Sequence, residues 1–194
     1  MASLAGYMRF QIEHAEKPFL NVGVGANPCG WEGPGVVHVD LDRWRYHNFV
    51  QTDIHNLPFK DDSFKSVVAG DVLEHLVDPL KALQEMRRVA PKIVLTTFQE
   101  WRLGGPGLSI ERGAELFAPD PKAFAPYYES GRCLAQTPES LLSHIPHINQ
   151  WVGRQELIDL FTSAGLGVEF YEVDCPGIHE GHAMLNYLFV LRRC

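Results

Sequence analysis

The chain has 194 residues, the length of one globular domain, and its 45% hydrophobic and 21% charged residues are typical of a folded protein. Its 24 acidic residues outnumber 17 basic ones, and the resulting net charge of −7 disfavours nucleic acid and anionic membranes as partners. No apolar run approaches the ~20 residues that span a bilayer, and the first residues resemble no secretory signal, so we expect a cytoplasmic protein.

Short apolar runs alternate with helical patterns over most of the chain. The predicted strands, in chain order, are Phe19–Gly23, Val36–Val39, Phe49–Thr52, Ser66–Ala69, Lys92–Thr97, Val168–Val173 and Leu185–Leu191. A helix is predicted to begin at Asp78-Pro79, with Asp as the N-cap, and another covers Arg154–Ala164. This alternation predicts an α/β fold in one domain over residues 1–194, a Rossmann-like, doubly wound and mostly parallel sheet. The last two strands have no helix between them, which predicts an antiparallel C-terminal hairpin.

Glycine and proline gather in two places. Seven of them lie between Gly23 and Gly35, which leaves room for at most one helical turn between the first two strands. Eleven more lie between Phe98 and Gln150, after the fifth strand. Long irregular segments in a compact domain are usually lids or substrate pockets, so we expect residues 98–150 to be a substrate-side insertion.

Ligands of open α/β sheets bind beyond the carboxyl ends of the strands, and four strand ends carry suitable residues. They are Gly23-Val24-Gly25, Asp40, Asp53-Ile54 and Gly70-Asp71. Glycines let backbone approach a ligand closely, and a carboxylate can accept hydrogen bonds from two neighbouring hydroxyls. Each feature alone also fits a tight turn or a solvated acid, but their order together predicts a ligand site.

The run FLNVGVGANP, VVHVDLD, TDIHNLPFKDDSFKSVVAGDVLEHL and RRVAPKIVLTTF resembles the class I methyltransferases that use S-adenosylmethionine. The likeness covers about residues 18–97, and the later INQWVGRQELIDLFTSAGL resembles the helix before the sixth strand of such enzymes. One departure is Asn21, because the first strand of these enzymes often carries an acid at that position.

The resemblance implies a cofactor role for nine positions. Asp40 would hold the ribose hydroxyls, with Leu41 against the adenine. Asp53 would accept from the adenine amino group, with Ile54 against the ring. The remaining positions, toward the methionine end or in the glycine loop, are Gly23, Gly25, Asn27, Gly70 and Asp71.

Methyl transfer from a sulfonium is an in-line displacement that leaves S-adenosylhomocysteine, so the protein mainly aligns the reactants and excludes water. A general base is needed only when the acceptor must lose a proton. The candidates are His75, which follows the fourth strand, and His144 and His147, where the insertion rejoins the scaffold. His75 could equally orient its loop. The spacing of His144 with His147, repeated by His179 and His182, lacks an accompanying carboxylate pattern, so no metal site is predicted.

We therefore expect an S-adenosylmethionine-dependent methyltransferase acting on oxygen or nitrogen of a small-molecule acceptor, possibly sugar-like. A catalytically inactive binding or regulatory module of the same fold is the alternative. A nicotinamide-dependent oxidoreductase is disfavoured because the third glycine of GxGxxG is absent. Nucleic-acid methylation is disfavoured too, because Asp71-Val72-Leu73-Glu74 stands where an NPPY-type tetrapeptide would be needed.

Overall fold

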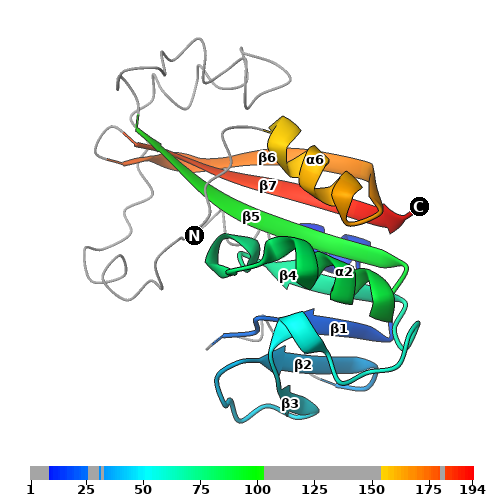
Figure 1. Cartoon of the computed structure of the whole chain (residues 1–194). Coiled ribbons are helices and arrows are strands. Elements are labelled where there is room, and N and C mark those ends of the chain that lie inside the picture. The colour runs from blue at the N-terminus through cyan, green and yellow to red at the C-terminus, as the bar shows by residue number, and fades with distance from the viewer. Residues whose placement is uncertain (1–8, 26–30, 32, 103–153, 180–181) are drawn as a thin grey trace.

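The computed structural model of the protein describes residues 9–25, 31, 33–102, 154–179 and 182–194. They form a seven-stranded sheet of order β3-β2-β1-β4-β5-β7-β6 (Figure 1). The strands are β1 Phe19–Val22, β2 Val36–Asp40, β3 Phe49–Gln51, β4 Ser66–Gly70, β5 Lys92–Arg102, β6 Leu166–His179 and β7 His182–Arg193. Strands β1 to β5 are parallel, whereas β7 runs antiparallel to β5 and β6. The predicted α/β fold with its antiparallel hairpin is confirmed.

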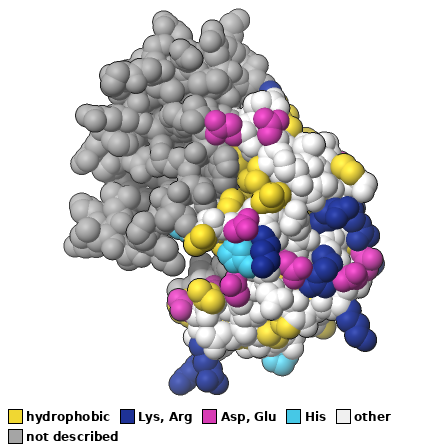
Figure 2. Space-filling model, in the orientation of Figure 1, with side chains coloured by type: hydrophobic (Ala, Val, Ile, Leu, Met, Phe, Trp, Pro, Cys, Tyr) yellow, Lys and Arg dark blue, Asp and Glu magenta, His cyan; other side chains and the backbone are white. Residues whose placement is uncertain are grey.

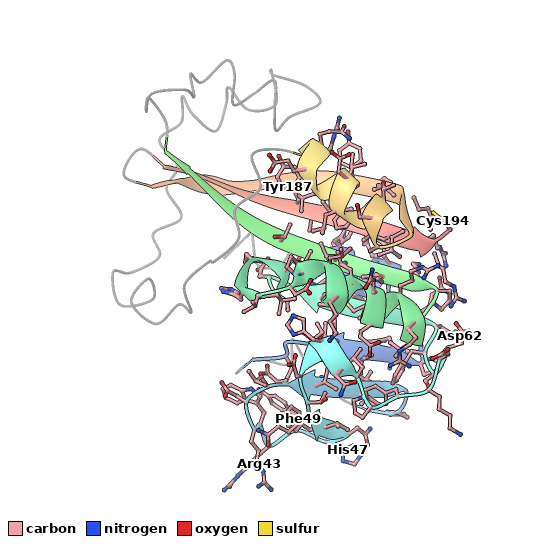
Figure 3. The ribbon with its side chains drawn as sticks, in the orientation of Figure 1. Arg43, His47, Phe49, Asp62, Tyr187 and Cys194 are labelled. Carbon is pink, nitrogen blue, oxygen red and sulfur yellow. The ribbon has the colours of Figure 1, made fainter. Side chains whose placement is uncertain are left out.

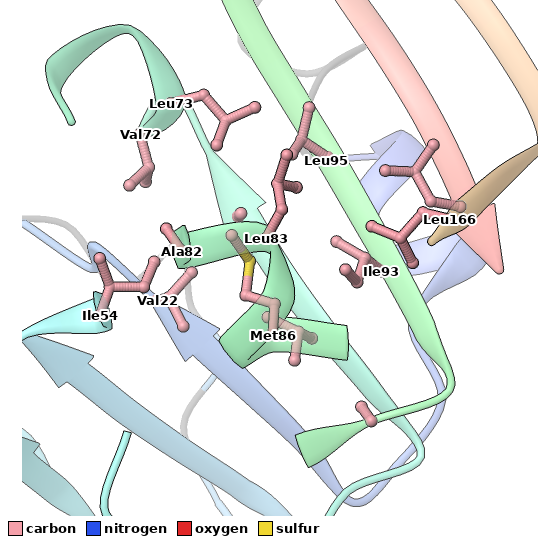
Figure 4. Close-up of a cluster of buried hydrophobic side chains, with 14 of the residues drawn as sticks. Val22, Ile54, Val72, Leu73, Ala82, Leu83, Met86, Ile93, Leu95 and Leu166 are labelled. Atoms are coloured by element: carbon pink, nitrogen blue, oxygen red, sulfur yellow. The ribbon is translucent and has the colours of Figure 1, made fainter. Parts of the chain in front are cut away.

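Helices α2 (Pro79–Val89) and α6 (Arg154–Ser163) cover one face of the sheet (Figure 1). Helix α2 begins as predicted, because the Asp78 side chain accepts a hydrogen bond from the Lys81 N–H at 2.9 Å. Its buried residues Leu83 and Met86 pack into the main core with side chains of β1 and β5 (Figure 4). Two 3₁₀ turns, η1 (Ile54–Asn56) and η2 (Leu73–His75), follow β3 and β4.

The opposite face of the sheet is covered differently. Residues 9–14 are helical, and Phe10 packs there with Trp31 and with valines of β4 and β5. Two hydrogen bonds fasten this segment to β5: Gln11 Nε2 lies 3.3 Å from Thr96 Oγ1, and Lys92 Nζ lies 2.8 Å from Glu16 Oε1.

The connection from β2 to β3, residues 41–48, contains no helix although the two strands are parallel. Phe49 lies level with His38, so the chain must return only about 7 Å along the sheet after Asp40. An extended segment of this length spans that distance easily. The shortness of β3 therefore makes a crossover helix unnecessary here.

Strands β5, β6 and β7 are longer than the sequence predicts. The prediction that β5 ends at Thr97 and that the insertion begins at residue 98 is wrong, because β5 continues to Arg102 and pairs with β7 throughout. The segment around Pro176-Gly177 suggests a turn, yet β6 runs through it and accommodates it in a register shift between Asp174 and Gly177. The remaining predicted boundaries differ by one or two residues.

The last pair between β4 and β5 joins Gly70 to Thr96, so β5 extends past β4 from Thr97 to Arg102. Together with its partners β7 and β6 it projects beyond the carboxyl edge of the parallel strands (Figure 1). We call this projection the β-extension, residues 97–102, 173–179 and 182–187. Within the described residues, no helix is long and apolar enough to cross a bilayer.

Candidate functional site

The turn after β1 has two glycines with left-handed backbone, Gly23 at φ 64° and Gly25 at φ 56°. A Cβ on Gly23 would lie 2.5 Å from Val72 Cγ2, so the turn packs closely against the segment after β4. A Cβ on Gly25 would meet no described atom within 4 Å. No described residue therefore closes this side of the Gly25 backbone.

Asp40 ends β2 and connects the strand to this turn. Its Oδ2 accepts the Gly25 N–H at 2.8 Å, and its Oδ1 accepts the Asp42 N–H at 3.0 Å. Each carboxylate oxygen has a second lone pair, so the group can still accept two donors from a ligand. Leu41, the next residue, is 70% exposed, an unusual position for a large apolar side chain.

Asp53 follows β3 and caps η1. Its Oδ1 accepts two hydrogen bonds from His55, one from the backbone N–H at 2.9 Å and one from ring Nδ1 at 2.6 Å. These bonds, the backbone one first, lower the pKa of the Asp53 carboxyl and keep it ionised. The Thr52 N–H donates to the Asp40 carbonyl at 2.9 Å, which holds the ends of β2 and β3 together. Ile54, by contrast, is buried in the main core.

The segment after β4 lies beside the glycine turn. Asp71 has φ 51°, a conformation that only glycine and a few polar residues adopt readily, and its N–H donates to the Thr96 carbonyl at 3.0 Å. Glu74 in η2 is fully buried and accepts a hydrogen bond from Thr97 Oγ1 at 3.1 Å. His75 is half-buried at the end of the same turn.

Tyr46 is a member of this site that the sequence reasoning missed. Its hydroxyl donates to the Gly25 carbonyl at 2.9 Å, and its ring centroid lies 5.7 Å from that of His38. His38 is buried on β2, and its Nδ1 lies 3.2 Å from Asn21 Nδ2 on β1. Asn21 stands at the position where an acid is expected, and it contacts a histidine of the neighbouring strand.

The predicted site residues of the four strand ends thus gather along one edge of the sheet. Asn27, His144 and His147 lie outside the described residues. His179 and His182 occupy paired positions beside the turn of the β6–β7 hairpin. Within the part of the chain that the structure describes, no three His, Cys, Asp or Glu residues are grouped as a metal ion requires.

Comparison with known proteins agrees with this geometry. A family profile described as a methyltransferase domain matches residues 34–92, from the turn before β2 to the first residue of β5. A S-adenosylmethionine-dependent methyltransferase from Methanosarcina mazei superposes over 94% of this chain and 96% of its own, with a TM-score of 0.57 and 17% identity. Over residues 34–92 the chain is thus similar to methyltransferase domains in sequence, and over nearly its whole length it shares their fold.

A second solved structure of similar fold contains both a cofactor product and an acceptor. The Burkholderia thailandensis 1,6-didemethyltoxoflavin-N1-methyltransferase, with bound 1,6-didemethyltoxoflavin and S-adenosylhomocysteine, superposes with a TM-score of 0.61. It is 16% identical, and the alignment covers 99% of this chain and 78% of that chain. At this low sequence identity, the superposition shows a shared fold only.

Two curated relatives are demethylmenaquinone methyltransferases. The protein from Paenarthrobacter aurescens is 35% identical over 75 residues, which are 39% of this chain. The protein from Streptomyces griseus is 24% identical over 156 residues, which are 78% of this chain. The chain spans 29% and 63% of the lengths of these two relatives.

Proposed function

We propose that the protein is a cytoplasmic enzyme that transfers a methyl group from S-adenosylmethionine to oxygen or nitrogen of a small-molecule acceptor. The observation that carries the proposal is the Asp40 carboxylate bonded to the Gly25 N–H at 2.8 Å. This contact joins a diol-binding group to an open glycine turn, and both lie at the sheet edge where the fold binds ligands.

The described residues fit the adenosyl cofactor. Asp40 offers free acceptor positions for the ribose hydroxyls, and exposed Leu41 offers an apolar surface for the adenine. Asp53, kept ionised by His55, is a suitable acceptor for an amino group. The open side of Gly25 admits close approach of the ligand to the backbone. The other residues that we place around the cofactor are Gly23, Asn27, Ile54, Gly70 and Asp71.

When bound, S-adenosylmethionine supplies an electrophilic methyl group on a sulfonium whose leaving group is a neutral thioether. The chain's own contribution is then to orient the reactants and to exclude water. An acceptor that must lose a proton needs a base, and we propose His75, His144 or His147 for this role. His75 is the described candidate, half-buried at the end of η2.

A small acceptor is supported by the relatives, whose names refer to demethylmenaquinone and 1,6-didemethyltoxoflavin. We propose that the domain comprises residues 1–194. We also propose that the acceptor lies between the strand ends that we assign to the cofactor, the β-extension and the insertion. Of the insertion predicted over residues 98–150, the structure describes only the strand residues 98–102.

Calorimetric titration with S-adenosylhomocysteine tests the cofactor site directly. We expect the wild-type protein to bind and Asp40→Ala to weaken binding about 10- to 100-fold, because charge-assisted hydrogen bonds to the ribose are lost. Asp42→Ala is the matched control, since Asp42 contributes only its backbone N–H. Absence of wild-type binding at millimolar ligand, or equal affinity of Asp40→Ala and wild type, would contradict the proposal.

Catalysis is tested separately with cofactor labelled on its methyl group and a panel of quinol, phenol, amine and sugar acceptors. We expect label to appear in at least one acceptor class. Tight cofactor binding without transfer to any of them would instead favour an inactive binding module.

A further inference from the structure

Both backbone polar groups of Gly25 are bound by one short segment of the chain. The Gly25 N–H donates to Asp40 at the end of β2, and the Gly25 carbonyl accepts from the Tyr46 hydroxyl six residues later. The segment between them is the connection 41–48, which returns without a helix to β3. This connection therefore has a second task besides linking two strands, because it holds the glycine turn from both sides.

The Tyr46 hydroxyl is held in place by the packing of its ring. The ring centroid lies 5.7 Å from that of His38 and 6.4 Å from those of Trp44 and Phe49, so the ring has neighbours on several sides. Other members of the segment, including Arg43 and His47, are exposed and point away from the sheet (Figure 3). Tyr46 is thus the member of this loop that turns inward to the glycine turn.

Two anchors are needed because Gly25 itself supplies no rigidity. A glycine at φ 56° has no side chain to limit its backbone torsions, and a single hydrogen bond leaves the peptide free to rotate about the bond axis. The Asp40 contact alone would leave that freedom. The Gly25 N–H and carbonyl belong to the two peptides on either side of its Cα, and the second bond, from Tyr46, holds the peptide that carries the carbonyl. Together the two bonds limit φ and ψ of Gly25 and keep its N–H directed toward Asp40 Oδ2.

The orientation of the Asp40 carboxylate depends in turn on this N–H. One oxygen is fixed by Gly25 at 2.8 Å and the other by Asp42 at 3.0 Å, which leaves the remaining lone pairs directed outward. A carboxylate that binds two adjacent hydroxyls must present both oxygens in a fixed plane. We propose that Tyr46 is a positioning residue, whose hydroxyl holds the Gly25 carbonyl, limits the backbone torsions of Gly25 and thereby keeps Asp40 oriented toward the ribose hydroxyls of the cofactor.

This inference rests on the proposed function, since it assigns Asp40 to the ribose. It assigns Tyr46 no contact with the cofactor. The effect of Tyr46 on ligand affinity passes through Gly25 and Asp40, so that effect should depend on the ribose hydroxyls of the ligand.

Tyr46→Phe removes the hydroxyl and keeps the ring contacts. We expect its dissociation constant for S-adenosylhomocysteine, measured by calorimetry, to rise about three- to tenfold, the usual effect of one hydrogen bond. Tyr171→Phe is the matched control, because it removes a hydroxyl bonded to Arg154 at the α6–β6 end of the sheet. Its affinity should equal that of the wild type.

The same titrations with 2′-deoxy-S-adenosylhomocysteine distinguish positioning from general loosening of the turn. If Tyr46 acts through Asp40 on the ribose, the ratio of mutant to wild-type dissociation constants falls toward one with this ligand. An equal loss with both ligands, or a Tyr46→Phe affinity equal to wild type, overturns the inference while the proposed function stands. Failure of the wild type to bind S-adenosylhomocysteine overturns the proposed function itself.

Discussion

Gly23 excludes a side chain for two separate reasons. Its φ of 64° is unfavourable for residues with a Cβ, and a Cβ built there would lie 2.5 Å from Val72 Cγ2. Gly25 has a similar φ of 56° but no described atom within 4 Å of the corresponding position. The two glycines therefore separate the backbone cost of a substitution from its steric cost.

We predict that Gly23→Ala lowers the free energy of unfolding by about 2–4 kcal/mol, the sum of a left-handed backbone and an overpacked contact. Gly25→Ala should cost only the backbone part, about 1–2 kcal/mol. In a Val72→Ala background the cost of Gly23→Ala should fall to that of Gly25→Ala. Urea denaturation of the four variants checks this cycle, and a cost unaffected by Val72→Ala would contradict it.

Residues at strand ends could be predicted from the sequence, because each follows an apolar run directly. Tyr46 and Thr97 could not. Tyr46 is one of several aromatic residues in its segment, and its role depends on where residues 41–48 return in space. Thr97 ends the strand predicted from the sequence, but its bond to buried Glu74 joins two segments far apart in the chain and has no signal in the local pattern.

Among the elements, α2 holds the loop that follows η1. Arg88 on α2 donates to the carbonyls of Leu57 and Phe59 at 2.9 and 2.7 Å, and to Asp61 at 2.9 Å. Glu85, one turn earlier, accepts the Leu57 N–H at 2.9 Å and also bonds Arg88. This arrangement fixes the loop next to Asp53, on a face where Figure 2 shows basic and acidic side chains interleaved.

We predict that Arg88→Gln lowers the free energy of unfolding by about 1–3 kcal/mol, because two loop carbonyls and Glu85 lose their donor. The neighbouring Arg87→Gln is the control: Arg87 donates to one carbonyl, that of Gly165, at 3.1 Å. Its cost should be about 0.5–1.5 kcal/mol. Equal effects of the two variants in thermal or urea denaturation would contradict the special role of Arg88.

The pH dependence of this pair follows from Glu85. The hydrogen bond from Arg88 lowers the pKa of the Glu85 carboxyl, so the folded state favours its ionised form. The resulting stabilisation is complete above the ordinary glutamate pKa of about 4.3 and is lost as the pH falls through the lowered folded-state pKa. The stability difference between wild type and Arg88→Gln should therefore shrink on acidification through this range, as denaturation at several pH values would show.

The elements themselves were predictable where the pattern was strong. The N-cap Asp78 and the apolar spacing of α2 identify that helix from the sequence alone. The β-extension was missed because Pro176 and Gly177 usually end a strand, whereas a register shift absorbs them here. Hydrogen bonds to the long β7 hold this part of β6 in a strand, which the local sequence pattern did not predict.

At the scale of the whole molecule, the candidate site lies along one edge of the sheet. The ends of β1, β2, β3 and β4 all contribute to the candidate site, and all belong to the parallel part of the sheet. A ligand bound there contacts segments that are adjacent only in the folded state, so binding should stabilise the whole domain.

We predict that S-adenosylhomocysteine at 100 times its dissociation constant stabilises the protein by about 2.7 kcal/mol. For a domain of this size that corresponds to a rise in Tm of about 5–11 °C. NAD at the same concentration is the control and should leave Tm unchanged. Differential scanning fluorimetry measures both, and a shift with NAD alone would contradict the cofactor assignment.

The topology as a whole was predictable because helices and buried strands alternate in the sequence. The connection of residues 41–48 is short for parallel strands, and the register of β3 explains how the chain crosses between them. The described cover of the second sheet face, by residues 9–14 and Trp31, was not predictable, because it depends on which segments fold back across the sheet.

Because of the β-extension, the two halves of the sheet differ in how much sequence change they tolerate. The residues that we propose for the cofactor lie at the ends of β1 to β4. The described part of the β-extension continues beyond these ends, and its strands pair there with one another. Sequence drift in the projecting half leaves the β1–β4 framework and its buried partners on β7, such as Phe189 and Leu191, intact. If the proposed function is correct, descendants of one such gene can diverge in the acceptor that they methylate while the proposed cofactor site stays the same.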